Sequence, residues 1–157
     1  MDRGTYNLAL VLHLLGALMF VAGIVLAGVA FEAARRRGQA AEVALLLSIT
    51  RIGVLLVALG TLLIGAFGLW LVHLGRLGYG TGWVDASIGL FIAALALGAH
   101  GGQSPKRARR LALELAARGA PVSGELRGLL DDPISRIENY LSLGLVLAIV
   151  VLMVLRP

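Results

Sequence analysis

The sequence predicts an all-α membrane protein: a transmembrane, antiparallel four-helix bundle with an amphipathic helix between the third and fourth helices. Hydrophobic residues make up 59% of its 157 residues, which is more than an ordinary soluble domain of this size contains. Four apolar stretches, residues 8–31, 52–74, 84–100 and 134–155, are each roughly 17–24 residues long, enough to cross a hydrocarbon core of about 30 Å as helices. We therefore expect a single integral membrane domain over residues 1–157.

Transmembrane β-structures fit the sequence less well than helices. An open sheet edge cannot satisfy its hydrogen bonds in lipid, and the apolar stretches are too long and too uniform for barrel strands. The chain also contains no cysteine, which excludes disulfides, thiolate metal sites and thiol catalysis.

Basic residues are distributed unequally between the two sides of these four crossings. Eleven of the fourteen Lys and Arg residues fall on one side, and only Arg3, Arg76 and Arg156 fall on the other. The eleven are Arg35, Arg36, Arg37, Arg51, Lys106, Arg107, Arg109, Arg110, Arg118, Arg127 and Arg136. By the positive-inside rule, both basic connections face the cytoplasm and both termini face outward. We expect a bacterial-type cytoplasmic membrane.

The first two crossings are predicted to be joined by a short turn on the basic side. Arg35 to Arg37 would lie in the last turn of the first helix, with Gly38 at its C′ position. The second helix is expected from about Gln39 to His73, and the glycine-rich segment 75–83 then forms an outer turn with aromatic anchors.

The connection over residues 101–132 is the longest one. Ser104 and Pro105 are typical of a helix cap and first turn, and basic and apolar residues alternate at helical spacing over about 104–118, which predicts an amphipathic helix at the membrane surface. Gly119 to Pro121 would end this helix, a brief turn would span 123–130, and Asp132 with Pro133 would begin the last crossing. The basic segment either fixes topology or docks to anionic lipid headgroups; nucleic acid is not expected.

Small residues indicate where helices pack against one another. Gly16 and Gly23 are one heptad apart on the first helix, as are Gly53 and Gly60 on the second. Small residues four apart also mark the third and fourth helices, at Gly89 and Ala93, Ala94 and Gly98, and Gly144 and Ala148. Such residues allow close backbone approach in lipid. The same seams could serve a homo-oligomer or a larger membrane complex.

Two histidines are candidates for a ligand site in the outer half of the bundle. His13 lies about 7–8 Å inside the first crossing, and His73 ends the second crossing, which runs the other way, so we expect similar heights. Imidazoles from facing helices can hold haem b or a transition metal ion, with Asp85 as a third metal ligand or as an acceptor that fixes an imidazole tautomer. Alternatively, His13 hydrogen-bonds a neighbouring helix and His73 lies at the interface beside Trp70.

A second polar group is expected on the cytoplasmic side. Arg51 begins the second crossing and Glu138 lies in the first turns of the fourth, so the two could form a structural ion pair. The alternative is that Arg51 holds a substrate carboxylate or propionate. His100 lies about 24 Å down the third crossing, near this side. No charged residue lies at mid-depth of a crossing, which argues against a proton-coupled transporter.

The segment from Tyr6 to Gly23, YNLALVLHLLGALMFVAG, resembles the first helix of an uncharacterised family of small bacterial integral membrane proteins. For that family the likeness covers the whole four-crossing plan. Around His13 the segment is also similar to HemJ-type protoporphyrinogen oxidases and to the CopD copper-resistance membrane domain. The first similarity implies a haem-binding enzyme with His13 as ligand, and the second implies copper passage. HemJ-type proteins carry a lysine on the third helix, whereas Lys106 here lies in a connection.

Three functions follow as hypotheses. The first is a protein that binds haem or a metal ion through His13 and His73. The second is a structural or assembly subunit of a membrane complex, and the third is a small transporter or lipid-handling protein without a cofactor. Whether the protein is an enzyme is left open, although hydrolysis by an activated serine is not expected because no serine has a neighbouring histidine in sequence.

Overall fold

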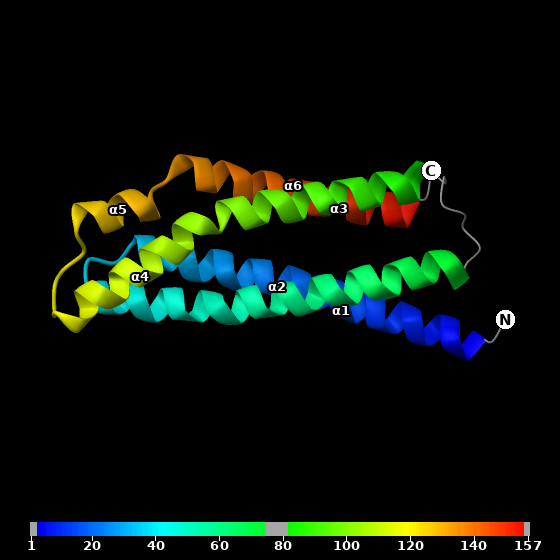
Figure 1. Ribbon diagram of the computed structural model, residues 1–157, viewed down its shortest axis with the longest axis horizontal. Coiled ribbons are helices and arrows are strands. Elements are labelled where there is room, and N and C mark those ends of the chain that lie inside the picture. The colour runs from blue at the N-terminus through cyan, green and yellow to red at the C-terminus, as the bar shows by residue number, and fades with distance from the viewer. Residues whose placement is uncertain (1–2, 75–81, 156–157) are drawn as a thin grey trace. The chain divides into compact units, whose positions relative to one another are not determined.

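The computed structural model describes residues 3–74 and 82–155, and this part of the chain is helical without a β-strand (Figure 1). One isolated antiparallel bridge joins Gln39 and Pro121. The helices are α1 (Arg3–Arg35), α2 (Ala40–Leu74), α3 (Gly82–Gly101), α4 (Gln103–Ala117), α5 (Gly124–Leu130) and α6 (Pro133–Leu155).

Four helical segments are long and apolar enough to cross a membrane: Arg3–Arg35, Ala40–Leu74, Gly82–Ala117 and Gly124–Leu155. They contain the four crossings predicted from hydropathy. α1 and α2 have 33 and 35 residues, or about 50 Å each at helical rise. They therefore exceed the hydrocarbon thickness, and their ends extend into the headgroup zone or the helices tilt. The predicted outer turn lies mostly outside the described residues.

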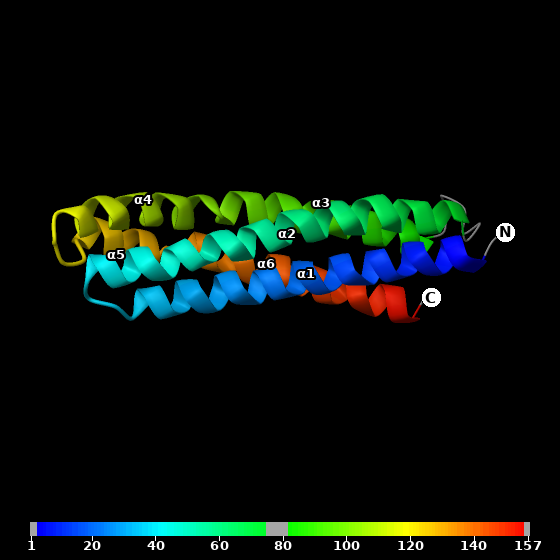
Figure 2. The same ribbon diagram turned by 90° about the horizontal axis from the view of Figure 1, so that it is seen from below.

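The chain divides into two compact units, which are described separately below. One unit comprises residues 1–37 and 42–78, and the other comprises residues 38–41 and 79–157. The first contains the antiparallel hairpin of α1 and α2, and the second contains α3 to α6 (Figures 1 and 2).

Glycines bring the two helices of the first hairpin into backbone contact. A Cβ added at Gly23 would lie 2.5 Å from the Gly53 carbonyl oxygen, and one added at Gly53 would lie 2.7 Å from the Gly23 carbonyl oxygen. Gly16 and Gly60 face each other in the same way, with a Cβ at Gly60 placed 2.7 Å from the Gly16 carbonyl oxygen. The seam predicted from the two heptad pairs is confirmed.

Buried small residues extend this seam along α1, whereas many large apolar residues of this helix point outward. Ala9, Gly16, Gly23 and Ala30 recur every seven residues and are all buried. Leu18, by contrast, is 69% exposed. This inverts the pattern of a soluble protein, because lipid solvates leucine as well as a protein core does and close packing is left to small residues.

The second unit uses hydroxyl groups where the first uses glycine. The Ser142 hydroxyl on α6 donates to the Ala94 carbonyl oxygen on α3 at 3.0 Å, and the Ser135 hydroxyl donates to the Gly101 carbonyl oxygen at 2.6 Å. Both serines are buried. They join α3 to α6 at two levels, about two turns apart on each helix.

The small-residue motifs of α3 and α6 are only partly used in this packing. Ala94 is buried, and a Cβ at Gly98 would lie 3.7 Å from the Ser142 hydroxyl oxygen. At Gly89 and Gly144 an added Cβ would meet no described atom within 4 Å. Gly89 and Gly144 therefore do not mark a contact within the described chain, where serine hydroxyls join α3 to α6. The alternative that these motifs join copies of the protein stays a prediction.

α4 is found where the amphipathic segment was predicted, but it begins differently. Gly102 precedes it in a helical conformation without a side-chain cap, so α4 continues α3 within this unit (Figures 1 and 2). Ser104 is not the cap that the sequence suggested. Its hydroxyl donates instead to Asp132 at 2.6 Å, and Asp132 in turn accepts from the backbone of Ile134 at the start of α6.

The ends of α4 and α5 follow the sequence signals closely. Gly119 has φ of 63°, and the backbone N–H groups of Gly119 and Ala120 donate to the carbonyl oxygens of Ala116 and Leu115. This pattern is a Schellman motif, which needs a left-handed residue at C′. Ser123 caps α5 by accepting from the Leu126 N–H at 3.1 Å. Pro133 is the first residue of α6, as predicted.

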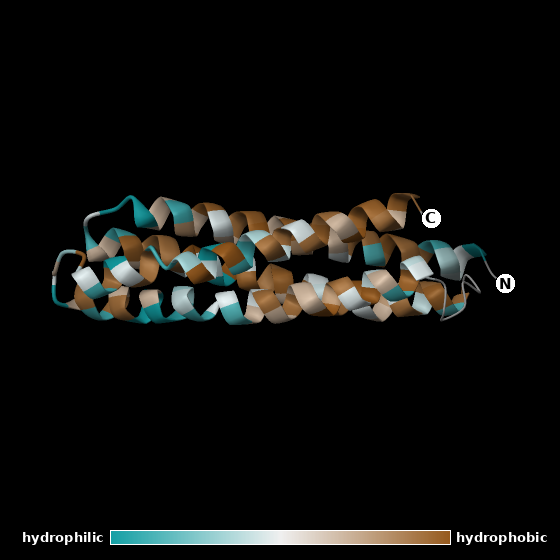
Figure 3. Ribbon diagram, turned by 90° about the horizontal axis from the view of Figure 1, so that it is seen from above, coloured by the Kyte–Doolittle hydropathy of each residue, from teal (hydrophilic) through white to brown (hydrophobic). Residues whose placement is uncertain are grey.

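The turn between α1 and α2 differs from its prediction at one residue. Gly38 was expected at the C′ position, which is commonly left-handed, but among the described glycines only Gly119 has a positive φ. The end of α1 is instead held by Glu32, which pairs with Arg35 at 3.0 Å and with Arg36 at 3.5 Å. Within each unit, charged residues gather toward the helix connections and apolar residues cover the long helices (Figure 3).

Candidate functional site

His13 packs against α2 within the first hairpin. Its Nδ1 lies 3.2 Å from the Ile64 carbonyl oxygen. A Cβ added at Gly68 would lie 3.1 Å from the His13 Cε1 atom. Gly68 therefore leaves the room that the imidazole occupies beside the α2 backbone.

The hydrogen bond to Ile64 determines which ring nitrogen carries the proton. A carbonyl oxygen can only accept, so Nδ1 is the donor. In the neutral ring the lone pair then lies on Nε2, for which the described residues provide no hydrogen-bond partner. A histidine held in this way presents Nε2 to a metal or to a hydrogen-bond donor.

His73 does not lie at the level of His13. It is nine residues beyond Ile64, which corresponds to two and a half helical turns, or about 14 Å along α2. Two and a half turns also place it on the side of α2 opposite to the face that packs on α1, and it is exposed. The expectation that the two histidines lie at similar heights is therefore wrong. It used the ends of the apolar stretches, whereas the glycine contacts determine the register of α1 against α2. A site shared by the two histidines stays a prediction.

Asp85 lies in the first turn of α3, in the second unit, and is exposed. Over the ranges 3–74 and 82–155, no three His, Asp or Glu side chains gather in a group that could hold a metal ion. The role of Asp85 beside the histidines stays a prediction.

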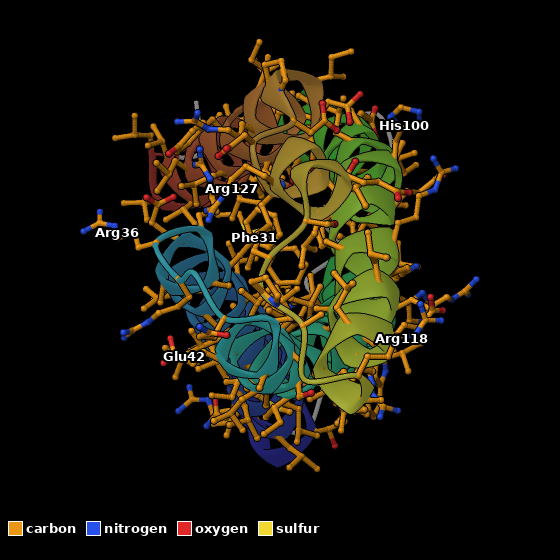
Figure 4. All side chains as sticks on the ribbon, turned by 90° about the vertical axis from the view of Figure 1, so that its left-hand side faces the viewer. Phe31, Arg36, Glu42, His100, Arg118 and Arg127 are labelled. Carbon is orange, nitrogen blue, oxygen red and sulfur yellow. The ribbon has the colours of Figure 1, made fainter. Side chains whose placement is uncertain are left out.

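Glu138 has a different partner from the one predicted. Its two carboxylate oxygens lie 2.8 and 2.9 Å from Nδ1 of His100. The His100 side chain is 67% exposed and points outward from α3 (Figure 4). Arg51 is exposed and belongs to the other unit, so its pairing with Glu138, or with a substrate carboxylate, stays a prediction.

Two further residues of α2 lie on the same side as the His13 contacts and were missed from the sequence. Thr61, Gly65 and Gly68 are spaced i, i+4 and i+7, which places them along one flank of the helix. The Thr61 hydroxyl oxygen is buried and has no hydrogen-bond partner among the described residues. The signal available in the sequence was a threonine followed by two glycines at helical spacing.

α4 carries the basic surface of the second unit. Lys106, Arg107 and Arg110 are exposed, whereas Ala108 and Ala112 on its other face are buried. Arg118, which follows α4, points outward (Figure 4). α4 is therefore amphipathic in the structure, with its cations available to an anionic surface.

Comparison with known proteins identifies a family but no characterised relative. No curated protein and no solved structure matches the chain. Residues 7–157 match the family described as "Predicted integral membrane protein (DUF2269)". This match covers both units and all four candidate spans apart from the first four described residues. The chain is therefore an integral membrane protein that belongs to the DUF2269 family.

Proposed function

We propose that the first hairpin binds haem through Nε2 of His13. The observation that carries this proposal is the hydrogen bond from His13 Nδ1 to the Ile64 carbonyl oxygen, because in the neutral ring it leaves Nε2 unprotonated on a half-buried side chain of an apolar hairpin. A half-buried imidazole in a membrane helix is costly, and such residues often mark a functional site. Haem, when bound, would supply one-electron chemistry within the membrane.

The donor atoms suit haem better than a bare metal ion. Zinc, copper and similar ions take three or four protein ligands in most sites, and no such group forms within residues 3–74 and 82–155. Haem brings four of its own nitrogens and needs one axial imidazole from the protein, or two. The role of the chain's own residues is to fix the imidazole of His13, through Ile64, and to make room for it, through Gly68.

Absorption spectroscopy of the full chain tests this proposal. The purified protein in detergent is titrated with haemin, and the Soret band is recorded for the wild type, His13→Ala, His73→Ala and His100→Ala. We expect saturable, one-to-one binding by the wild type, its loss in His13→Ala, and wild-type binding by His100→Ala, since His100 lies in the other unit and is exposed.

The outcomes separate the alternatives. Loss of the band in His73→Ala as well would support the shared histidine site. A wild-type protein that binds no haem, or a His13→Ala variant that binds it normally, would overturn the proposal and leave the structural, assembly or lipid-handling functions.

We also propose that the turn between α1 and α2 and the segment containing α4 face the cytoplasm of a bacterial-type membrane. The excess of Lys and Arg in these two connections supports this orientation. The exposed cations of α4 would then contact anionic lipid headgroups.

A further inference from the structure

The turn between α1 and α2 neutralises its own cations. Glu32 pairs with Arg35 at 3.0 Å and with Arg36 at 3.5 Å. Across the turn, Nε of Arg37 lies 3.7 Å from a carboxylate oxygen of Glu42. Each of the three arginines therefore has an acidic partner, which weakens the attraction of this connection for an external anion.

α4 carries its cations without such partners. Lys106, Arg107 and Arg110 are exposed, and within the part of the chain that the structure describes none of the three forms an ion pair. α4 contains four basic residues and one acid, Glu114. Its uncompensated charge makes α4 the stronger anion-binding surface of the two connections.

The apolar face of α4 is not available to lipid. Ala108 and Ala112 are fully buried, and α4 packs on α5, where Leu126 and Leu130 are also fully buried. An interfacial helix binds a membrane by burying its apolar face at the boundary of the acyl chains. Because protein already covers this face, α4 offers its charged face, on which Leu113 is the one exposed large apolar residue of the helix.

α4 runs on from α3 and does not fold back across it (Figures 1 and 2). α3 has 20 residues, or about 30 Å at helical rise, which matches the hydrocarbon core. Along the helices, Lys106 and Arg110 are about 8–14 Å beyond Gly101, whereas Arg118 is about 25 Å beyond it. The headgroup zone is about 5–8 Å deep. With a Debye length of about 8 Å, its charge therefore reaches the first two cations and not Arg118.

Helix geometry also directs these side chains toward the membrane. In an α-helix the Cα–Cβ bonds tilt toward the N-terminus, and the N-terminus of α4 adjoins α3. The long stems of Lys106, Arg107 and Arg110 therefore tilt toward the headgroup zone, into which they can extend their charged ends.

We propose that the first two turns of α4 bind phosphate groups of anionic phospholipids through Lys106, Arg107 and Arg110, by charge alone and without inserting α4 into the bilayer. The inference rests on the lipid contact proposed above for α4 and assigns its residues and its mode, and it is independent of haem binding. It excludes Arg118, which is too far from the headgroups, and the arginines of the turn between α1 and α2, which are paired.

Two arginines on one face of α4 give the direct test. Arg107 and Arg118 are both exposed and eleven residues apart, which is three helical turns, so they differ mainly in their distance from the membrane. The full chain is held in micelles of a neutral detergent. The dissociation constant of a short-chain phosphatidylglycerol is measured by native mass spectrometry, with phosphatidylcholine as the uncharged reference. We expect the wild type to prefer phosphatidylglycerol, Arg107→Gln to bind it about fivefold more weakly, as for one basic residue near an anionic surface, and Arg118→Gln to bind like the wild type.

A second comparison removes three charges from each connection. One variant replaces Lys106, Arg107 and Arg110 by glutamine, and the matched control replaces the three arginines at positions 35–37 by glutamine. We expect the first variant to lose the preference for phosphatidylglycerol and the control to keep it. Circular dichroism and thermal unfolding show whether both variants are folded.

Insertion is tested with a depth probe. The chain has no cysteine, so Leu113→Cys can be labelled with a fluorophore, and Leu62→Cys on α2, where the leucine is 68% exposed, serves as the lipid-facing reference. In phosphatidylglycerol vesicles, lipids with a nitroxide on the acyl chain should quench the label at position 62 and not the label at position 113. Equal quenching at both positions would show that α4 inserts, and would overturn the proposed mode.

The remaining outcomes separate this inference from the proposals above. If the wild type does not distinguish the two lipids, the lipid contact of α4 and this inference fail together, and haem binding is unaffected. If the wild type prefers phosphatidylglycerol and the folded triple variant of α4 does so equally, the contact lies elsewhere and this assignment is overturned. Equal losses in Arg107→Gln and Arg118→Gln would indicate a partner along the whole face, such as an acidic protein segment, and would also overturn it.

Discussion

At the scale of single residues, the reason for a glycine differs from one position of this protein to another. At Gly16, Gly23, Gly53 and Gly60 the absence of a side chain allows backbones to touch. At Gly119 the requirement is conformational, because φ is 63°. Elsewhere, as at Gly28, an added methyl group would meet nothing. Substitutions of chemically identical residues should therefore have very different consequences.

The first prediction concerns the contact at Gly23. Gly23→Ala would place a Cβ 2.5 Å from a carbonyl oxygen of α2, and we expect it to lower the free energy of unfolding by about 1–3 kcal/mol, as overpacking does. Gly28→Ala on the same helix should be neutral or stabilising by up to about 1 kcal/mol, since alanine favours helix. Thermal unfolding in one detergent compares the two; equal stability of both variants would contradict the tight seam.

The second prediction concerns the end of α4. Gly119→Ala forces an L-residue into the left-handed region, and we expect a loss of about 1–2 kcal/mol. Gly128→Ala, within α5 and without a close neighbour, should not destabilise the protein. Hydrogen exchange of the amides of residues 119 and 120 reports directly on the Schellman motif, so unchanged protection in Gly119→Ala would count against it.

At the scale of helices, the two hairpins solve the same problem differently. Hydrophobic burial cannot drive helix association when lipid surrounds both helices. α1 and α2 gain contact through glycine and alanine, whereas α3 and α6 are joined by serine hydroxyls at two levels. The Ser104 contact with Asp132 adds a third link, just outside the last crossing. Loss of serine hydroxyls should therefore destabilise the packing of α3 on α6, and added methyl groups at the glycines should destabilise the packing of α1 on α2.

The third prediction tests this difference. The double variant Ser135→Ala, Ser142→Ala loses both hydroxyl bonds between α3 and α6, and we expect it to be less stable by about 1 kcal/mol, given about 0.6 kcal/mol per interhelical bond in membranes. Ser87→Ala is the control because its hydroxyl bonds within α3, to Trp83. Denaturation in mixed micelles gives both values. A loss in Ser87→Ala as large as in the double variant would show that the hydroxyls matter only within their own helices.

At the scale of the whole molecule, the surface is that of a protein dissolved in lipid. Large apolar residues such as Leu18, Leu62 and Val154 are 68–74% exposed. Many of the buried residues are small, alanine and glycine among them. The charged residues concentrate near the connections, where the long helices leave the apolar phase. In the proposed orientation, four alternating crossings would bring the two basic connections to the same side of the membrane.

The fourth prediction concerns orientation. The chain has no cysteine, so single substitutions can be labelled without background. A membrane-impermeant maleimide added to spheroplasts should label Arg3→Cys and spare Arg36→Cys and Arg118→Cys, and inside-out vesicles should give the reverse. Labelling of residues 36 and 118 from opposite sides would contradict the four-crossing plan, whereas complete reversal would contradict only the proposed orientation.

The amino-acid sequence by itself determined that this protein is helical and membrane-embedded, where its four candidate spans lie, and which glycines join α1 to α2. These properties depend on hydropathy, helical periodicity and residue size, all of which are local. The tertiary structure alone decided the register of the helices. It shows that His13 contacts Ile64 and Gly68 and that His73 lies at another level and on another face of α2. It also shows that Glu138 pairs with His100. Register depends on contacts between residues far apart in sequence, and a difference of a few residues rotates a side chain to the other face of a helix.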